Sequence, residues 1–187
     1  LVTVWGVDLG LKDSATASNG DKLTIKQTLK YAKALATAQR AKNKRRVKAI
    51  HAKIKHTRQD LIHKFTTQLV KDNALIVVGD IQSNQFNSKK GKLAKSVYDA
   101  GWFELKRQLT YKCENAGCRF EIVNEKYTTQ TCSCCGDMSS SPKGRAGLRI
   151  REWTCVKCGT WHDRDINASK NILAVGLDRL VEGIPSL

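Results

Sequence analysis

Two pairs of cysteines toward the carboxyl-terminal end of this 187-residue chain constrain its fold more than any other feature. Each pair has the form Cys-x-x-Cys-Gly, and 19 residues separate the two pairs. The four cysteines are Cys132, Cys135, Cys155 and Cys158. A Cys-x-x-Cys turn presents two sulfurs to one ion, and Zn²⁺ prefers four thiolates in a tetrahedron. The pattern therefore predicts a zinc ribbon over residues 127–161 that holds one structural Zn²⁺.

The remaining cysteines do not form a matching set. Cys134 lies inside the first pair and cannot join the same tetrahedron without displacing a neighbour, while Cys113 and Cys118 have no partner pair. We interpret all three as ordinary reduced thiols. Redox-active pairs are the alternative interpretation of Cys-x-x-Cys, but the strand and helix that flank such a redox motif are missing here. Seven cysteines used in this way indicate metal binding in a reducing compartment, so we expect a cytoplasmic protein.

The charge of the chain favours a polyanionic partner. The formal net charge is +16, and the segment from Lys30 to Lys71 holds 13 Lys and Arg against one acid, Asp60. A basic helix on a membrane surface is the main alternative, but such helices carry large apolar side chains on the opposite face, and the aromatics here are Tyr31 and Phe65. No apolar run approaches the ~20 residues of a membrane-spanning helix, and no signal-peptide pattern is present. We therefore predict nucleic acid, and no membrane, as the partner.

Within this basic segment, residues 42–55 are predicted to contact the nucleic-acid backbone. The stretch has few aromatic residues for stacking on bases, so contact with phosphate without reading of sequence is expected. The residues concerned are Lys42, Lys44, Arg45, Arg46, Lys48, Lys53 and Lys55.

The order of the predicted elements is typical of an RNase H-like α/β fold. A strand over 2–9 is followed by a hairpin that turns at Asn19-Gly20, and an amphipathic helical region covers 31–71. A buried strand over 75–78, a polar loop over 82–92, a helix over 97–115 and a strand over 119–123 come next, and a last helix starts at Asp165. We expect a mixed sheet with flanking helices, divided into residues 1–126 (with a basic helical insert over 31–72), the ribbon, and residues 162–187.

Three carboxylates lie where this topology would bring them together. Asp8 ends the first strand, Asp80 follows the fourth, and Asp165 opens the last helix. A charged residue in an apolar strand is costly unless it is paired or binds metal. Each also has a simpler interpretation. Asp8 could be a strand-end residue in water, Asp80 a turn-forming residue, and Asp165 a helix N-cap. Together they predict a site for two divalent ions that hydrolyses a phosphodiester.

Four motifs resemble the carboxyl-terminal half of the TnpB (transposon OrfB) family, which is related to compact type V CRISPR effectors. They are Gly6-Val7-Asp8-Leu9-Gly10, Asp99-Ala100-Gly101-Trp102, the eight residues from Thr129 to Gly136, and the six from Asp163 to Ala168. The resemblance implies a RuvC-type nuclease core with an inserted ribbon that cuts DNA chosen by a guide RNA. It implies that Asp8 and Asp165 are catalytic and bind Mg²⁺ or Mn²⁺. A recognition region precedes this core in the family, and since the chain begins within a strand at Leu1, we expect such a region in the natural protein.

The chain departs from the family at the second catalytic position. A Glu normally closes the fourth strand, but here the aligned residue is Gly79, and Asp80 comes one residue later. One step along a strand turns a side chain to the opposite face, so Asp80 serves only if the strand has ended or a bulge redirects it. Three hypotheses follow: a Mg²⁺-dependent RNA-guided DNA endonuclease, a guided DNA-binding protein that no longer cleaves, and a zinc-stabilised nucleic-acid-binding protein without a guide.

Overall fold

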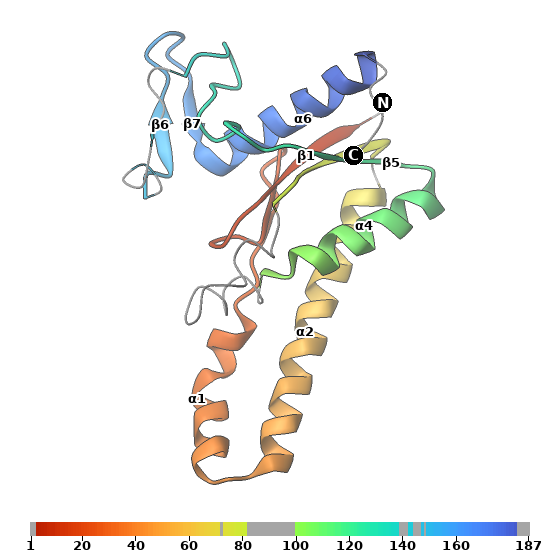
Figure 1. Ribbon diagram of the computed structural model, residues 1–187, viewed down its shortest axis with the longest axis vertical. Helices are drawn as coiled ribbons and strands as arrows, with labels where there is room; N and C mark the ends of the chain where they lie inside the picture. The colour runs from red at the N-terminus through yellow and green to blue at the C-terminus, as the bar shows by residue number, and fades with distance from the viewer. Residues whose placement is uncertain are drawn as a thin grey trace.

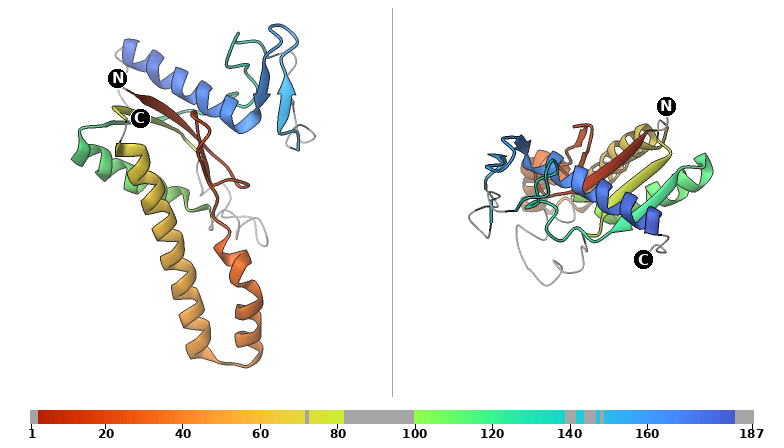
Figure 2. Two further views of the ribbon diagram at one scale, coloured as in Figure 1. Left: turned by 180° about the vertical axis from the view of Figure 1, so that it is seen from behind. Right: turned by 90° about the horizontal axis from the view of Figure 1, so that it is seen from above.

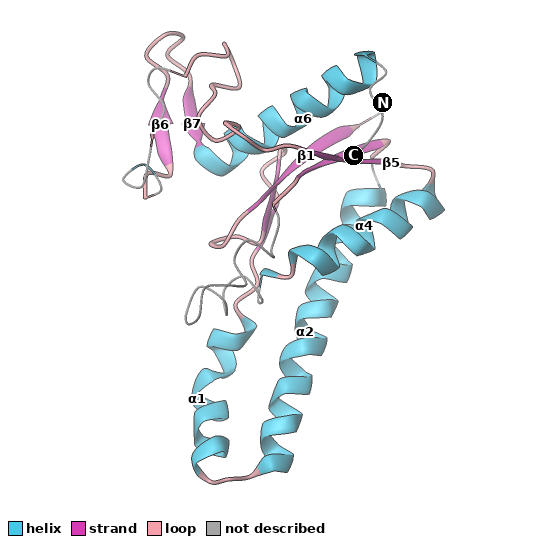
Figure 3. Ribbon diagram, viewed as in Figure 1, coloured by secondary structure: helices cyan, strands magenta, loops and turns pink. Residues whose placement is uncertain are grey.

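The computed structural model describes residues 3–71, 73–81, 100–138, 142–143, 147 and 149–182. A five-stranded sheet in the order β3-β2-β1-β4-β5 lies at its centre (Figures 1 and 3). The strands are β1 (Val4–Leu9), β2 (Ala15–Ala17), β3 (Lys22–Leu23), β4 (Leu75–Gly79) and β5 (Arg119–Val123). β1 pairs antiparallel with β2 and parallel with β4, which in turn pairs parallel with β5. The predicted mixed sheet is confirmed, and so is the hairpin that turns at Gly20, where φ is 97°.

Helices cover both faces of the sheet (Figure 2). α6 (Arg164–Glu182) lies on one face, and α2 (Lys44–Lys71) and α4 (Trp102–Ala116) lie on the other. Alternation along each strand sends neighbouring side chains to opposite faces. Val7 and Val78 pack toward α2 and α4, whereas Val77 and Val123 pack against Ile172 of α6. Each face therefore has its own apolar layer, with the sheet between them.

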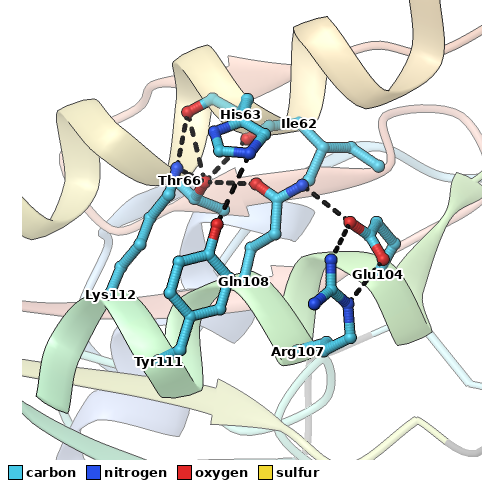
Figure 4. A network of polar contacts seen from close by, with 8 residues as sticks. All are labelled: Ile62, His63, Thr66, Glu104, Arg107, Gln108, Tyr111 and Lys112. Atoms are coloured by element: carbon cyan, nitrogen blue, oxygen red, sulfur yellow. Dashed lines mark hydrogen bonds and ion pairs between the residues drawn. The ribbon is translucent and has the colours of Figure 1, made fainter. Parts of the chain in front are cut away.

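α1 (Gln27–Arg40) and α2 form a helical hairpin that projects from the sheet (Figure 1). The two helices bury a small core of their own, which is built from Ala38, Ile50 and Ile54. The α2 end nearer the sheet packs on α4 through a polar network (Figure 4). The fully buried Thr66 and Gln108 lie 3.0 Å apart there, and Lys112 Nζ donates to Thr66 Oγ1 at 2.7 Å. Because buried polar groups need specific partners, this network fixes how α2 lies on α4 and hence where the hairpin points.

The zinc-ribbon region adds a two-stranded sheet of β6 (Glu152–Thr154) and β7 (Trp161–Asp163), which leads directly into α6. The sequence order of strands and helices agrees with the predicted RNase H-like order. The predicted polar loop over 82–92, the first residues of the predicted helix over 97–115, and Asp99 lie outside the described residues.

Candidate functional site

The four predicted zinc ligands come together in the ribbon. Their sulfurs all lie within 4.8 Å of one another, and Sγ of Cys132 is 3.7 Å from that of Cys158, as is Sγ of Cys135 from that of Cys155. A tetrahedron with Zn–S bonds of about 2.3 Å has S···S edges of about 3.8 Å, so the cluster has the size of a ZnS₄ site. Cys134 is exposed and is not part of this group.

Backbone geometry explains why each cysteine pair is followed by glycine. Gly136 N–H donates to the Cys132 carbonyl at 2.9 Å, and Gly159 N–H donates to the Cys155 carbonyl at 2.8 Å. Both glycines have a positive φ, at 74° and 72°, which other residues adopt only with strain. The ring of His162 packs against that of Trp153, with centroids 4.6 Å apart and a tilt of 39°, and His162 Nε2 lies 3.0 Å from Cys132 Sγ. The ribbon is therefore shaped to hold its sulfurs in place.

Side chains of α6 bind the ribbon to the main sheet. The buried Asn167 accepts from Ser133 N–H at 2.9 Å and donates to the Thr131 carbonyl at 2.8 Å. Asn171 donates to the carbonyls of Thr128 and Thr131, both at 2.7 Å. Since α6 also packs on β1 and β4, one helix connects the cysteine cluster to the face of the sheet that carries Asp8.

Asp8 lies on the α6 face at the end of β1 and is 8% exposed. No described residue donates a hydrogen bond to its carboxylate. Burial raises the pKa of Asp8 well above its ordinary value. The charges of Asp165 and Glu125 raise it further, and the charges of Arg164 and Arg151 oppose this rise. The interpretation of Asp8 as a strand-end residue in water thus does not match its surroundings. Crowded, buried carboxylates with raised pKa values are characteristic of functional sites.

Asp165 lies in the first turn of α6, and the cap of this helix is Asp163. The Asp163 Oδ1 accepts from the backbone N–H groups of Asp165 and Ile166, both at 3.0 Å. The Asp165 carboxylate instead pairs with Arg151 of the ribbon, whose Nη1 lies 3.1 and 3.2 Å from the two Asp165 oxygens. The Asp165 side chain is therefore not used to cap the helix.

Asp80 is held on the other side of the sheet. Its Oδ1 lies 3.1 Å from Nζ of Lys106, a residue of α4, and the same Nζ donates to the Ile81 carbonyl. Alternation along β4 accounts for this placement, because Gly79 faces α6 and the next residue faces α4. The charge of Asp165 acts on Asp8, whereas Asp80 is paired with Lys106 of α4.

Glu125 is an acidic residue at the site that we did not predict. It lies two residues beyond the end of β5, and its charge acts on Asp8. A Cβ atom added to Gly79 would lie 2.6 Å from Glu125 Oε2. Burial raises the pKa of Glu125, Lys106 lowers it, and Asp80 raises it. In the sequence, Glu125 is marked only by its position just after a predicted strand. That position alone is a weak indication of a functional residue.

The basic residues predicted to contact phosphate lie at the far end of the helical hairpin, and all seven are exposed. Asn43 Oδ1 accepts from Arg46 N–H at 2.9 Å at the start of α2, and Lys53 Nζ lies 5.5 Å from the centre of the Tyr31 ring. In this part of α2, Val47, Ile50 and Ile54 pack against α1, and the basic side chains are exposed. Among the described helices, none is both long enough and apolar enough to span a bilayer.

Comparisons with known proteins match nearly the whole chain. The family model described as "Probable transposase" matches residues 2–89, and the one described as "Cas12f1-like, TNB domain" matches residues 102–172. A candidate RNA-guided DNA endonuclease of Streptomyces pristinaespiralis is 37% identical over 186 residues, covering 92% of this chain and 45% of the relative. The candidate RNA-guided DNA endonuclease InsQ of Escherichia coli K12 is 31% identical over 198 residues, covering 91% and 48%. The chain spans about half the length of these curated relatives.

A solved structure has the same fold. The cryo-EM structure of a Cas12f1–sgRNA–target DNA complex superposes with a TM-score of 0.67, covering 91% of this chain and 49% of that one. The sequence identity is 17%, so this likeness shows the fold alone. The likeness covers both the RNase H-like sheet and most of the ribbon of this chain.

Proposed function

Because the chain belongs to the TnpB family, we propose that it forms the RuvC-like nuclease core and zinc ribbon of an RNA-guided DNA-targeting protein. DNA and a guide RNA are its partners in this proposal, together with a region of the same protein that precedes the chain. Residues 1–126 and 162–187 form the core, and residues 127–161 form the ribbon. The observation that carries the proposal is the buried carboxylate of Asp8 in β1, on which the charge of Asp165 at the start of α6 acts.

Two kinds of metal fit the side chains of this chain. The cysteine cluster suits structural Zn²⁺, since four thiolates at tetrahedral spacing satisfy this ion. Asp8 and Asp165 offer hard carboxylate oxygens, which suit Mg²⁺ or Mn²⁺. When bound, such ions activate water and stabilise the leaving oxygen of a phosphodiester. The protein contributes a rigid β1 that holds Asp8, a capped helix that presents Asp165, and an arginine, Arg151, that orients the Asp165 carboxylate.

The exposed basic end of the hairpin would hold the nucleic-acid backbone. Lys42, Lys44, Arg45, Arg46, Lys48, Lys53 and Lys55 are the contact residues in this proposal. Lys and Arg on an outward face neutralise phosphates and release counterions, which gives binding without reading of bases. The network between Thr66 and Gln108 keeps this surface at a fixed position relative to the carboxylates.

Guided binding of DNA without cleavage is the second candidate function, and Gly79 is the observation that favours it. The family places a Glu at this position, and the acid that follows, Asp80, pairs with Lys106 on the α4 face. For Asp80 to act as the third carboxylate, this ion pair would have to open. The two candidate functions differ in whether the site has a working third carboxylate.

Nicking of a supercoiled plasmid distinguishes the two functions. The natural protein is assembled with its guide RNA and given a plasmid that carries the matching target, with Mg²⁺ or Mn²⁺. We expect nicking, and we expect Asp8→Asn and Asp165→Asn to abolish it. A guide RNA without a match on the plasmid is the control. A protein that shifts the matched plasmid on a gel but leaves it supercoiled would support binding without cleavage.

A further inference from the structure

We propose that Glu125 is the third metal-binding carboxylate of the site and that Gly79 provides the space it occupies. This assignment rests on the proposed function, because it concerns the same divalent-metal site as Asp8 and Asp165. It replaces the view that the site has lost its third ligand. The acid comes from the segment after β5 instead of the end of β4.

The register of the sheet places the three positions in one row. Val7 pairs with Val78 in the parallel β1–β4 ladder, so Asp8 and Gly79 are the next pair, and Gly79 pairs with Val123 of β5. Residues paired across parallel strands point to the same face, and in this row that is the α6 face. The chain then continues two residues beyond Val123 to Glu125.

The side chain of Glu125 lies over Gly79. A Cβ atom at position 79 would be 2.6 Å from Glu125 Oε2, 3.2 Å from Glu125 Cβ and 3.1 Å from Ile172 Cδ1. The carboxylate thus fills the volume in which a side chain at position 79 would begin. The Glu125 backbone is held by a turn, since its carbonyl accepts from the Thr128 N–H at 3.2 Å and from the Thr128 hydroxyl at 2.7 Å.

Two of the carboxylates are short of hydrogen-bond donors among the described residues. Glu125 Oε2 is buried and has no hydrogen-bond partner, and Asp8 receives no hydrogen bond from any described residue although it is more than nine-tenths buried. The nearby Lys106 is bonded to Asp80 and to the Ile81 carbonyl. Neighbouring carboxylates that are short of donors repel one another, and a divalent cation between them removes both costs. Asp8, Glu125 and Asp165 together are the oxygen ligands that Mg²⁺ and Mn²⁺ prefer.

The first experiment measures Mn²⁺ binding by calorimetry on the zinc-loaded natural protein. Glu125→Gln keeps the size of the side chain and removes its charge. We expect it to weaken Mn²⁺ binding by about tenfold or more, and we expect the same of Asp8→Asn and Asp165→Asn. In the plasmid assay, Glu125→Gln should lower the nicking rate by about 100-fold or more. A misplaced ion no longer aligns the attacking water with the phosphodiester. Glu114→Gln, at an exposed Glu of α4, is the matched control and should behave as the unsubstituted protein.

The outcomes separate this assignment from the proposed function. If Asp8→Asn and Asp165→Asn abolish Mn²⁺ binding and nicking but Glu125→Gln changes neither, Glu125 is not a ligand and the nuclease proposal stands. If the unsubstituted protein takes up no Mn²⁺ outside the ribbon, the metal site itself is overturned, and Glu125 with it. If Mn²⁺ binds through Glu125 and the target is still not nicked, the ligand assignment holds and cleavage is the part that fails.

The second experiment uses the contact between positions 79 and 125. Gly79→Ala adds one methyl group, which must displace the Glu125 carboxylate. We expect weaker Mn²⁺ binding from Gly79→Ala in the natural background and no further loss when Glu125→Gln is already present, since coupled residues are not additive. Gly79→Glu should reduce nicking in the natural background and restore part of it when combined with Glu125→Ala. A gain of nicking from Gly79→Glu alone would instead show a site that had lost its ligand and would overturn the assignment.

Discussion

At the scale of single residues, two acids separated by one position have different tasks. Asp163 caps α6 by accepting from two backbone N–H groups, and this leaves the Asp165 carboxylate for Arg151 and the site. Asp163 also pairs with Lys22 of the hairpin at 3.1 Å, and its pKa is lowered by the backbone N–H of Ile166 and by Lys22, against the effect of burial. The capped helix start supports the backbone of Asp165, and Arg151 orients its carboxylate.

The buried carboxylate of Asp8 should cost stability, which gives a first prediction. Its pKa is raised in the folded protein, so the ionised form destabilises the fold at neutral pH. Asp8→Asn, measured in the zinc-loaded protein at pH 7 without added Mg²⁺ or Mn²⁺, should raise the midpoint of thermal unfolding by ~2–4 °C for each kcal/mol relieved. In the plasmid assay the same substitution should abolish nicking. The gain should shrink as the pH falls through the raised pKa, because Asp8 is then protonated and neutral in the folded state.

The exposed Asp178 of α6 is the control for this prediction, and Asp178→Asn should leave the midpoint unchanged within about half a degree. A lower midpoint for Asp8→Asn than for the unsubstituted protein would show that the charged form of Asp8 is stabilised by the fold, contrary to its surroundings.

The sequence predicts some of these residues better than others. The cysteine cluster was predictable because the spacing of its members is local and specific. The roles of Asp8 and Asp165 rest on short motifs and stay predictions. Glu125 could not be predicted, since it reaches the site only through the pairing of β5 with β4 and the turn that follows β5. Asp80 is next to the expected position along the chain, but strand alternation puts its side chain on the other face.

At the scale of elements, the approach of α6 to β1 depends on glycine. A Cβ atom at Gly6 would overlap the Ser169 carbonyl and lie 2.8 Å from the Leu173 backbone nitrogen. Gly176 likewise allows α6 to lie close to β4, because a Cβ atom added there would be 2.5 Å from Val77 Cγ2. The close contact matters to function because Asp8 and Asp165 lie on these two elements.

We therefore predict that Gly6→Ala pushes α6 away from the sheet. Overpacking of this kind costs about 1–3 kcal/mol, and more where backbone must move, which urea unfolding would measure. Ala174→Ser, on the exposed side of α6, is the control and should leave the urea midpoint unchanged. The Gly6→Ala protein that remains folded should bind Mn²⁺ more weakly, and unaltered Mn²⁺ binding would show that the site tolerates the shift.

The basic end of the α1–α2 hairpin gives a prediction about salt. Replacing Lys44, Arg45 and Arg46 with Gln should weaken nucleic-acid binding and lower the slope of log K against log salt, by about 0.9 for each phosphate of duplex DNA that the protein no longer neutralises. The control variant carries Lys44→Arg, Arg45→Lys and Arg46→Lys, which keep the charges and change the shapes of the side chains. It should show the same slope of log K against log salt as the unsubstituted protein. A slope that the Gln variant leaves unchanged would show that these side chains only face solvent.

Element order and type were largely predictable, because periodicity and turn residues are local signals. The α1–α2 hairpin is less obvious, since residues 31–71 contain neither Gly nor Pro to mark its turn. The chain turns instead at Lys42, where φ is 50°, and Asn43 begins the next helix by accepting from Arg46 N–H. The buried pair of Thr66 and Gln108 was also beyond sequence reasoning, because polar residues on a helix are usually exposed.

At the scale of the whole molecule, the ribbon and the carboxylate site are mechanically connected. We predict one Zn²⁺ per chain by metal analysis, and its loss on Cys155→Ser. The same substitution should also reduce Mn²⁺ binding at the carboxylates, because Arg151 and the partners of Asn167 lie in the ribbon. Cys134→Ser is the control and should retain full zinc, since its thiol is exposed and outside the cluster. A zinc content near zero in the unsubstituted protein would rule out the ribbon site.

The way that α6 is bonded to the ribbon has a consequence for protein engineering. An exchange of ribbons between relatives would naturally be cut at the end of β7, before the helix begins. The amides of Asn167 and Asn171, however, are matched to carbonyls of residues 128 and 131, so a graft cut at that point would leave buried amide groups facing a foreign backbone. The transferable unit is therefore the ribbon together with the first two turns of α6, and a functional chimera should be cut after residue 171.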